Sequence, residues 1–470
     1  MNENPAALIP ELALLAGAVL GLLLGSWLPR RKQWVVCLLA ATACVWGLVA
    51  AVAAARRGPQ LVFGGSFAVD TATNTGRIIA LVATLLVICL SIETVRGHHR
   101  ETEFYVLLQL GALGAIVLVG ASDLLLLVAG YLLASIPLYA LAGFVKDAPG
   151  TEASMKYYLM GALLGVVLLT GVTILYGAGR ATGYAALAHS LPAGPKAAVA
   201  VGLVGVFGGL LFKIGGVPSH FWVPDVTEGA SIPAAAFVTT IPKIGGLVAA
   251  YRLVTQGLPA VSVDWPLLLA ILATASMTLG NLAAFFQTSV RRLLAYSTIS
   301  QVGYVLMAVA VATRSQLALP GLLFYLAAYA VTNLGTFAVV AEFPRATTVA
   351  DYRGLARNNP GIAVVLVVCL LGLVGTPPTA VFLGKLEVFA AAIDGGFTWL
   401  AVGAVINTVA SLFYYLRWIA PAFLARPASQ TLIPAGHWSV LAAYTAGAAS
   451  LGLGLAGGLV LPLMSGAALP

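Results

Sequence analysis

The stretch that decides the fold runs from residue 210 to residue 246 and reads LLFKIGGVPSHFWVPDVTEGASIPAAAFVTTIPKIGG. It places Lys213 and Lys243 in apolar surroundings, beside glycines and prolines. A charged lysine at the centre of a membrane helix costs roughly 2.5–3.5 kcal/mol on insertion scales. Pro218 interrupts the apolar run shortly after Lys213. A proline break next to a buried cation predicts an interrupted helix that lines a wet region inside a membrane protein.

The composition of the whole chain agrees with a membrane protein. The chain has 470 residues, of which 60% are hydrophobic and only 9% are charged, whereas a soluble domain carries roughly 25% charged residues. Apolar runs long enough to cross a bilayer recur throughout the sequence,. The formal charge of +8 is typical of the basic inner loops of membrane proteins and does not indicate nucleic-acid binding. These features predict an all-α, polytopic membrane protein and exclude a water-soluble one.

The apolar runs predict about fourteen membrane spans. They lie at about residues 7–27, 34–55, 78–95, 104–120, 122–144, 154–177, 198–216, 232–255, 264–286, 295–313, 317–341, 361–393, 397–424 and 438–464,. The span at 361–393 is too long for one straight helix and contains Pro377 and Pro378, so we expect a second broken helix there,. Two interrupted helices in corresponding positions of two halves indicate inverted repeats.

The distribution of basic residues predicts the orientation of these spans. With the N-terminus outside, the inner loops carry more lysine and arginine than the outer loops, to which we assign Arg77 and Arg252,.

Three lysines are the main candidates for chemistry: Lys213, Lys243 and Lys385. Burial disfavours the charged amine, so such a group can release and rebind a proton. The alternative is that each side chain extends to the membrane surface. For Lys156, near the start of its span, both interpretations have equal weight. His220 follows the Pro218 break and either relays protons or caps the second half of the helix,.

Several long motifs resemble the antiporter-like subunits of respiratory complex I. Residues 152–177 resemble the sixth helix of the family, and residues 210–246 resemble the seventh and eighth helices. Residues 287–310 resemble the tenth helix, and residues 351–389 resemble the broken twelfth helix. The resemblance covers roughly residues 80–465. Position 385 is a lysine and not an acid, and this residue type makes the chain resemble subunit N of NADH–quinone oxidoreductase more than the other antiporter-like subunits.

The resemblance implies a membrane-arm subunit of a proton-translocating enzyme complex, with no redox chemistry and no cofactor or metal in this chain. NAD, FMN, iron–sulfur clusters and quinone would belong to the whole complex. The partners would be neighbouring antiporter-like and small membrane subunits, and lipid, in a bacterial plasma membrane. In the family, Lys213, Lys243 and Lys385 match a row of proton-relay lysines, and Lys156 matches a further lysine on helix six.

The resemblance also implies four segments along the chain. They are an N-terminal three-helix segment (1–103), a first antiporter-like repeat with helices four to eight (104–260), a second, inverted repeat with helices nine to thirteen (261–425), and a C-terminal helix (426–470).

One position departs from the family in a way that bears on function. Helix five of the family reads roughly G-x-E-L-L-S-L-P-L-Y, and this chain has GYLLASIPLY at residues 130–139. Leu132 therefore stands where the family has a glutamate that pairs with the lysine of helix seven, and the nearest acid in the segment is Asp123. Two further departures are Gln301, where many members have histidine, and Glu387, where an uncharged residue is usual.

These departures leave three functions open. The chain pumps protons by a modified route that involves Glu387 or another acid, or it is a divergent, non-pumping scaffold copy of subunit N. The third possibility is a subunit of a multi-subunit cation/proton antiporter without a redox partner. Leu132 favours the scaffold, and the three retained lysines favour transport. The subunits that co-purify with the chain separate the antiporter from the other two.

Overall fold

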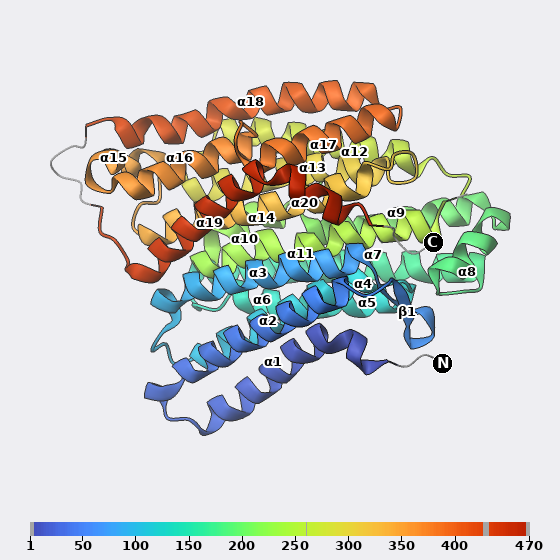
Figure 1. Ribbon diagram of the computed structural model, residues 1–470, viewed down its shortest axis with the longest axis horizontal. Coiled ribbons are helices and arrows are strands. Elements are labelled where there is room, and N and C mark those ends of the chain that lie inside the picture. Colours follow the sequence, from blue (N-terminus) through green and yellow to red (C-terminus); the bar gives the residue numbers. More distant parts are fainter. Residues whose placement is uncertain (1–3, 260, 426–431, 467–470) are drawn as a thin grey trace.

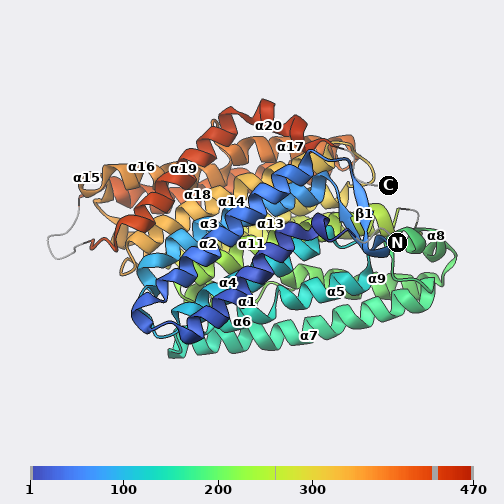
Figure 2. The ribbon, with the colours of Figure 1, turned by 60° about the horizontal axis from the view of Figure 1, so that its bottom comes forward.

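The computed structural model describes residues 4–259, 261–425 and 432–466. Within these residues, thirteen helices are long and apolar enough to cross a membrane. Two shorter helices, α16 (Pro360–Val374) and α17 (Ala380–Asp394), follow one another as the halves of a broken helix. The helices lie side by side along the long axis of the molecule (Figures 1 and 2). The prediction of an all-α, polytopic membrane protein with about fourteen spans is confirmed.

The other elements follow in chain order. The N-terminal part contains α1 (Ile9–Trp27), α2 (Trp34–Ala55), the short strands β1 (Gln60–Val62) and β2 (Phe67–Val69), and α3 (Thr71–Val95). The next part contains α4 (Glu101–Gly120), α5 (Leu124–Leu133), α6 (Ile136–Ala142), α7 (Ala148–Gly179), α8 (Tyr184–Ser190), α9 (Lys196–Ile214), α10 (Trp222–Gly229) and α11 (Ile232–Arg252). In the sequence, α16 and α17 are preceded by α12 (Trp265–Phe285), α13 (Val290–Ala310), α14 (Ala318–Glu342) and α15 (Leu355–Asn358). They are followed by α18 (Thr398–Phe423), α19 (His437–Leu455) and α20 (Gly457–Met464).

Three helices form the centre of the bundle. In the apolar, membrane-spanning parts of α11, α13 and α14, 94% of the residues are buried inside the protein, whereas only 33% are buried in those of α7 and α18. A helix that is hydrophobic on all sides suits such a central position. The polar residues on these central helices are therefore held away from lipid, which matters for the site described below.

Both broken helices are built in the same way. The helix α9 ends before Gly215 (φ 74°), and α16 ends before Gly375 (φ 89°). In each case a cis proline, Pro218 or Pro378, comes three residues after the glycine. Glycine is required because the left-handed conformation strains other residues. A Cβ atom at Gly375 would also lie 2.8 Å from Cδ of Lys385. The two predicted breaks are confirmed, and the division into four segments stays a prediction.

Some predicted boundaries differ from the structure. The predicted span 122–144 is divided into α5 and α6, and the span 438–464 is divided into α19 and α20. The third span begins at Thr71 and not at residue 78, because the carboxylate of Asp70 accepts a hydrogen bond from the backbone N–H of Thr73 at 2.9 Å and caps the helix,.

Two arginines assigned to outer loops are in fact buried inside helices. Arg77 lies in α3 and forms an ion pair with Glu11 of α1, at 2.7 Å. Arg252 ends α11 and binds Asp70 through both terminal nitrogens, at 2.8 and 2.7 Å. Their assignment was wrong because a charge near the end of an apolar run was counted as part of a loop. Removing them from the outer loops strengthens the basic excess on the inner side.

Candidate functional site

Lys213 lies on α9 and is completely buried. Its amine donates hydrogen bonds to the carbonyl oxygen of Ala134, at 2.9 Å, and to the hydroxyl oxygen of Ser135. Both acceptors come from the break between α5 and α6. The Ala134 carbonyl is available because the N–H of Leu138, its expected helical partner, instead bonds to Ser135 O at 3.0 Å,. The ring of Tyr131 adds a cation–π contact, with its centroid 5.0 Å from the amine,.

The hydroxyl of Ser135 is an uncharged partner of this lysine. Its hydroxyl donates to the carbonyl of Tyr131, at 2.6 Å, so an oxygen lone pair is left for Lys213,. Leu132, which the resemblance aligns with the glutamate of the family, is 40% exposed on the side of α5. The structure therefore supplies Lys213 with two uncharged acceptors and no carboxylate among the described residues.

Lys243 and Lys385 bind the two broken helices at equivalent points. Lys243 of α11 donates to the carbonyl of Ile214, the last residue of α9. Lys385 of α17 donates to the carbonyl of Val374, the last residue of α16, at 2.8 Å. A helical partner for each carbonyl would come four residues later, at Pro218 or Pro378, and proline has no N–H to donate,.

The lysine amines thus replace the hydrogen bonds that the two prolines cannot form. A cation at the C-terminal end of a helix is also favoured by the helix dipole. Lys385 has two further contacts, a hydrogen bond to the hydroxyl of Thr408 at 3.2 Å and a cation–π contact with the Tyr304 ring at 4.0 Å,. Both lysines are almost fully buried.

A network of uncharged groups begins one turn before Lys243 on α11. Asn333 of α14 donates to the hydroxyl of Thr240 at 2.9 Å. Tyr329 of α14 donates to the carbonyl of Thr239 at 3.0 Å and also lies 3.0 Å from the hydroxyl of Thr298 on α13. All of these side chains are buried. The network therefore joins the helix of Lys243 to the central helices α13 and α14.

Gln301 forms a second group of hydrogen bonds, at the second break. It lies one turn after Thr298 on α13, accepts a hydrogen bond from the hydroxyl of Tyr325 at 2.6 Å, and donates one to the carbonyl of Leu373 at 2.8 Å. The Leu373 carbonyl is free because its helical partner would be Pro377, which has no N–H,. Gln301 thus stabilises the same helix end that Lys385 binds.

The remaining candidates are placed differently. The side chain of Lys156 is 46% exposed and forms ion pairs with Glu152 at 2.7 Å and Asp225 at 2.9 Å. His220 is buried in the first break, and its Nδ1 has no hydrogen-bond partner among the described residues. Glu387 is half-buried on α17, beside Gly321 of α14, and its carboxylate forms no hydrogen bond or ion pair within the described parts of the chain. Among the candidate residues, Lys213, Lys243 and Lys385 are therefore the ones that are buried and donate to uncharged acceptors at a helix break.

Sequence reasoning missed several groups that hold these lysines. They are Ser135, Thr408 and Tyr304. Each is a polar or aromatic residue inside an apolar run, which is the signal that could have identified it. The backbone acceptors at the helix breaks carry no such signal. Across residues 4–259, 261–425 and 432–466, no cluster of three or more metal-binding side chains occurs.

Comparisons with known proteins identify the family of this chain. Residues 121–413 match the family model described as NADH:quinone oxidoreductase/Mrp antiporter, TM. The chain is 58% identical to NADH-quinone oxidoreductase subunit N 1 of Streptomyces griseus, with 98% of each chain covered, and 52% identical to subunit N of Mycobacterium sp. strain JLS, again with 98% of each covered. A chain of respiratory complex I from Thermus thermophilus is 32% identical and superimposes with a TM-score of 0.85, over 97% of this chain and 100% of that one. This chain therefore belongs to the family of NADH-quinone oxidoreductase subunit N.

Proposed function

We propose that this chain is a membrane-arm subunit of a proton-translocating NADH–quinone oxidoreductase, and that Lys213, Lys243 and Lys385 carry its protons. The observation that carries the proposal is the arrangement of the three buried amines. Each is held by uncharged acceptors, and two of them occupy equivalent positions at the ends of the broken helices. An intramembrane cation that is expensive to bury points to a role in transport.

The acceptors explain how such an amine can exchange a proton. Burial disfavours the ammonium form, whereas hydrogen bonds to carbonyl and hydroxyl oxygens favour it. Since no carboxylate binds Lys213, Lys243 or Lys385 in the described chain, loss of the proton leaves no unpaired anion behind. Small movements of the backbone at a helix break change the distance between the lysine amine and its oxygen acceptors. They thereby shift the equilibrium between the protonated and the neutral amine. The hydroxyl and amide groups between Lys243 and Lys385 provide donors and acceptors along the way.

The redox steps would take place in other subunits. We infer that NADH oxidation at flavin and iron–sulfur centres, and reduction of quinone, occur elsewhere in the complex, and that this chain binds neighbouring membrane-arm subunits in a bacterial plasma membrane. His220 remains a candidate for a further relay group because its Nδ1 is unpartnered in the first break. Lys156 fits a structural ion pair better, because its amine is exposed and shared between two acids.

The two alternative functions receive less support. The high identity to two relatives named subunit N favours the redox-driven complex over a separate antiporter. The scaffold interpretation rested on Leu132. Lys213 has two acceptors despite this leucine, so the missing glutamate does not by itself leave the lysine without a partner.

Deletion and complementation in the host bacterium test the proposal. A tagged copy of the chain should co-purify with the quinone-reducing subunits and should restore NADH-driven proton uptake by inverted membrane vesicles. An uncoupler that collapses the proton gradient serves as the control. Co-purification with small antiporter subunits alone would contradict the proposal, and so would restored NADH oxidation without proton uptake.

A further inference from the structure

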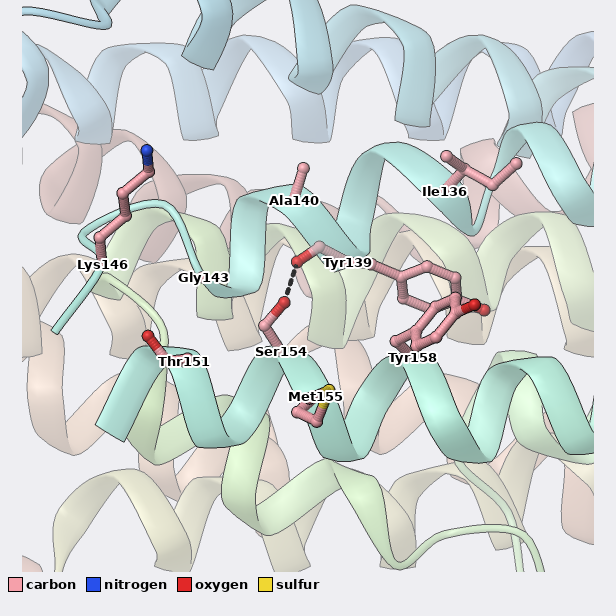
Figure 3. A pocket seen from close by; sticks show the side chains of 9 residues that line it. All are labelled: Ile136, Tyr139, Ala140, Gly143, Lys146, Thr151, Ser154, Met155 and Tyr158. Carbon is pink, nitrogen blue, oxygen red and sulfur yellow. Dashed lines mark hydrogen bonds between the residues drawn. The ribbon is translucent and has the colours of Figure 1, made fainter. Parts of the chain in front are cut away.

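A groove of about 830 Å³ lies between α6 and α7, and it belongs to none of the groups described above. Figure 3 shows its walls: Tyr139 and Ala140 come from α6, and Ser154 and Tyr158 from α7. Ser154 donates to the carbonyl of Tyr139 at 2.7 Å and so fixes the separation of the two helices at this point. The groove is open toward the side of the bundle, where its exposed apolar residues would meet lipid.

The two ends of the groove differ in polarity. Lys146 and Thr151 lie at one end, beside the connection between α6 and α7 (Figure 3). The rings of Tyr139 and Tyr158 form the other end and pack edge to face, with centroids 5.8 Å apart. Ile136, also at this end, is 62% exposed. A ligand that fits both ends needs a polar, anionic head and an apolar chain.

Two further basic residues lie against Phe144, two residues before Lys146. The amine of Lys146 forms no ion pair within the described chain. Arg100 donates to the carbonyl of Phe144, and its guanidinium lies 4.9 Å from the centre of the Phe144 ring. The ring of His98 lies 5.1 Å from the same phenylalanine.

Two carboxylates near Lys146 in the sequence each accept a hydrogen bond from another group. Asp147 caps α7 by accepting from the N–H of Gly150 at 2.9 Å, and Glu152 pairs with Lys156. Among the residues that line the groove, Lys146 is the only charged one, and it lies beside a connection between membrane helices. Basic residues at this level meet the phosphates of the bilayer.

We propose that this groove binds an anionic phospholipid, with the phosphate at Lys146 and an acyl chain along Ile136, Tyr139 and Tyr158. The phosphate of such a lipid lies at the membrane surface, where Lys146 lies, and its acyl chain extends from the phosphate into the membrane. A helix of a neighbouring subunit would need an acidic residue at that one position in order to match.

The groove also adjoins the partner segment of Lys213. Ile136 is the first residue of α6 and directly follows Ser135, whose hydroxyl accepts from Lys213. A bound acyl chain would therefore contact the break that holds this lysine. This consequence rests on the proposed function, whereas binding of the lipid does not.

The test uses the intact complex, purified from membranes with the parent chain or with a variant. Lys146→Gln removes the charge, and Ala140→Phe fills the groove from the exposed face of α6. The matched controls are Lys32→Gln, an exposed lysine on the same predicted inner side, and Ala53→Phe, an exposed alanine on α2. Two quantities are measured: the anionic phospholipid retained per complex, by mass spectrometry, and the change in thermal unfolding temperature on adding cardiolipin or phosphatidylcholine to delipidated complex.

We expect each groove variant to retain about one anionic phospholipid fewer than its control and to lose part of the stabilisation that cardiolipin gives. Phosphatidylcholine should stabilise all the chains equally. Equal retention and equal stabilisation in all variants would overturn the proposal. Loss of a neighbouring subunit from the Ala140→Phe complex, with retention of lipid unchanged, would show that a protein fills the groove and would overturn it as well. If Ala140→Phe fails to assemble, Lys146→Gln alone decides the result, because its exposed side chain makes no contact on which folding depends.

Discussion

Replacement of Gln301 by methionine tests whether its two hydrogen bonds stabilise the second break and support proton transfer there. Gln301 is 2% exposed and bridges the hydroxyl of Tyr325, at 2.6 Å, to the carbonyl of Leu373, at 2.8 Å. Methionine has a similar length but neither accepts nor donates strongly. The variant therefore removes both hydrogen bonds while it leaves little empty space.

The size of the effect follows from the two groups that lose a partner. A buried polar group without a hydrogen bond costs about 1–3 kcal/mol, so the pair costs about 2–6 kcal/mol. The Leu373 carbonyl has no alternative helical donor because Pro377 stands at the required position,. Histidine can both donate and accept through its two ring nitrogens. We therefore expect Gln301→His to lose less stability than Gln301→Met.

The assay compares both variants with Gln287→Met in the purified complex and in inverted vesicles. Gln287 is a suitable control because it lies just after α12 and its side chain donates only to Ala283 O near the end of that helix, at 3.0 Å. We expect Gln301→Met to lower the unfolding temperature and the number of protons taken up per NADH oxidised, and Gln287→Met to change neither. An unchanged proton ratio and an unchanged unfolding temperature in Gln301→Met would refute the bridge.

Three further predictions follow from the structure. Leu132→Glu should give little gain in proton uptake per NADH, because Lys213 already has two acceptors; a clear gain would show that the missing acid limits transport. Glu387→Gln should reduce proton uptake if this unpaired carboxylate takes part, and its effect should appear without a loss of assembly; unchanged uptake would remove Glu387 from the route. Asp70→Asn should destabilise the chain by about 3–5 kcal/mol in thermal unfolding, because it leaves Arg252 buried without a counter-ion,. Burial raises the pKa of Asp70, but the charge of Arg252 and the hydrogen bonds outweigh it and lower the pKa overall. The stabilisation by this pair is therefore present at neutral pH and should be lost as the pH falls below about 4, through the lowered pKa; a flat acid profile would contradict the assignment.

Much of the fold could be predicted because it depends on local sequence. Apolar runs of sufficient length give the spans, and Pro218 and Pro378 mark the two breaks because proline removes a backbone donor,. The break between α5 and α6 was not predicted, although Pro137 follows it as the second residue of α6. A single proline inside an apolar run does not reveal whether the helix continues, since neighbouring groups decide where the freed carbonyls bond.

The site could be predicted only in part. The burial of Lys213, Lys243 and Lys385 was evident from their neighbours, but their partners were not. The acceptors are backbone carbonyls and a serine from other helices, and their availability follows from the breaks rather than from residue type. For the same reason, the pairing of Arg77 with Glu11, far away in sequence, could not be inferred from loop counting.

The most direct test of proton transport by this chain compares Lys213→Met with Lys196→Met. Both lysines lie on α9, but Lys196 is exposed at the start of the helix and Lys213 is buried near its end. Removing the buried charge offsets the loss of two hydrogen bonds, so both complexes should assemble. The quantity measured is the number of protons taken up per NADH oxidised in inverted vesicles. We predict a lower ratio for Lys213→Met and the parent ratio for Lys196→Met. The parent ratio in an assembled Lys213→Met complex would show that protons do not pass through this lysine.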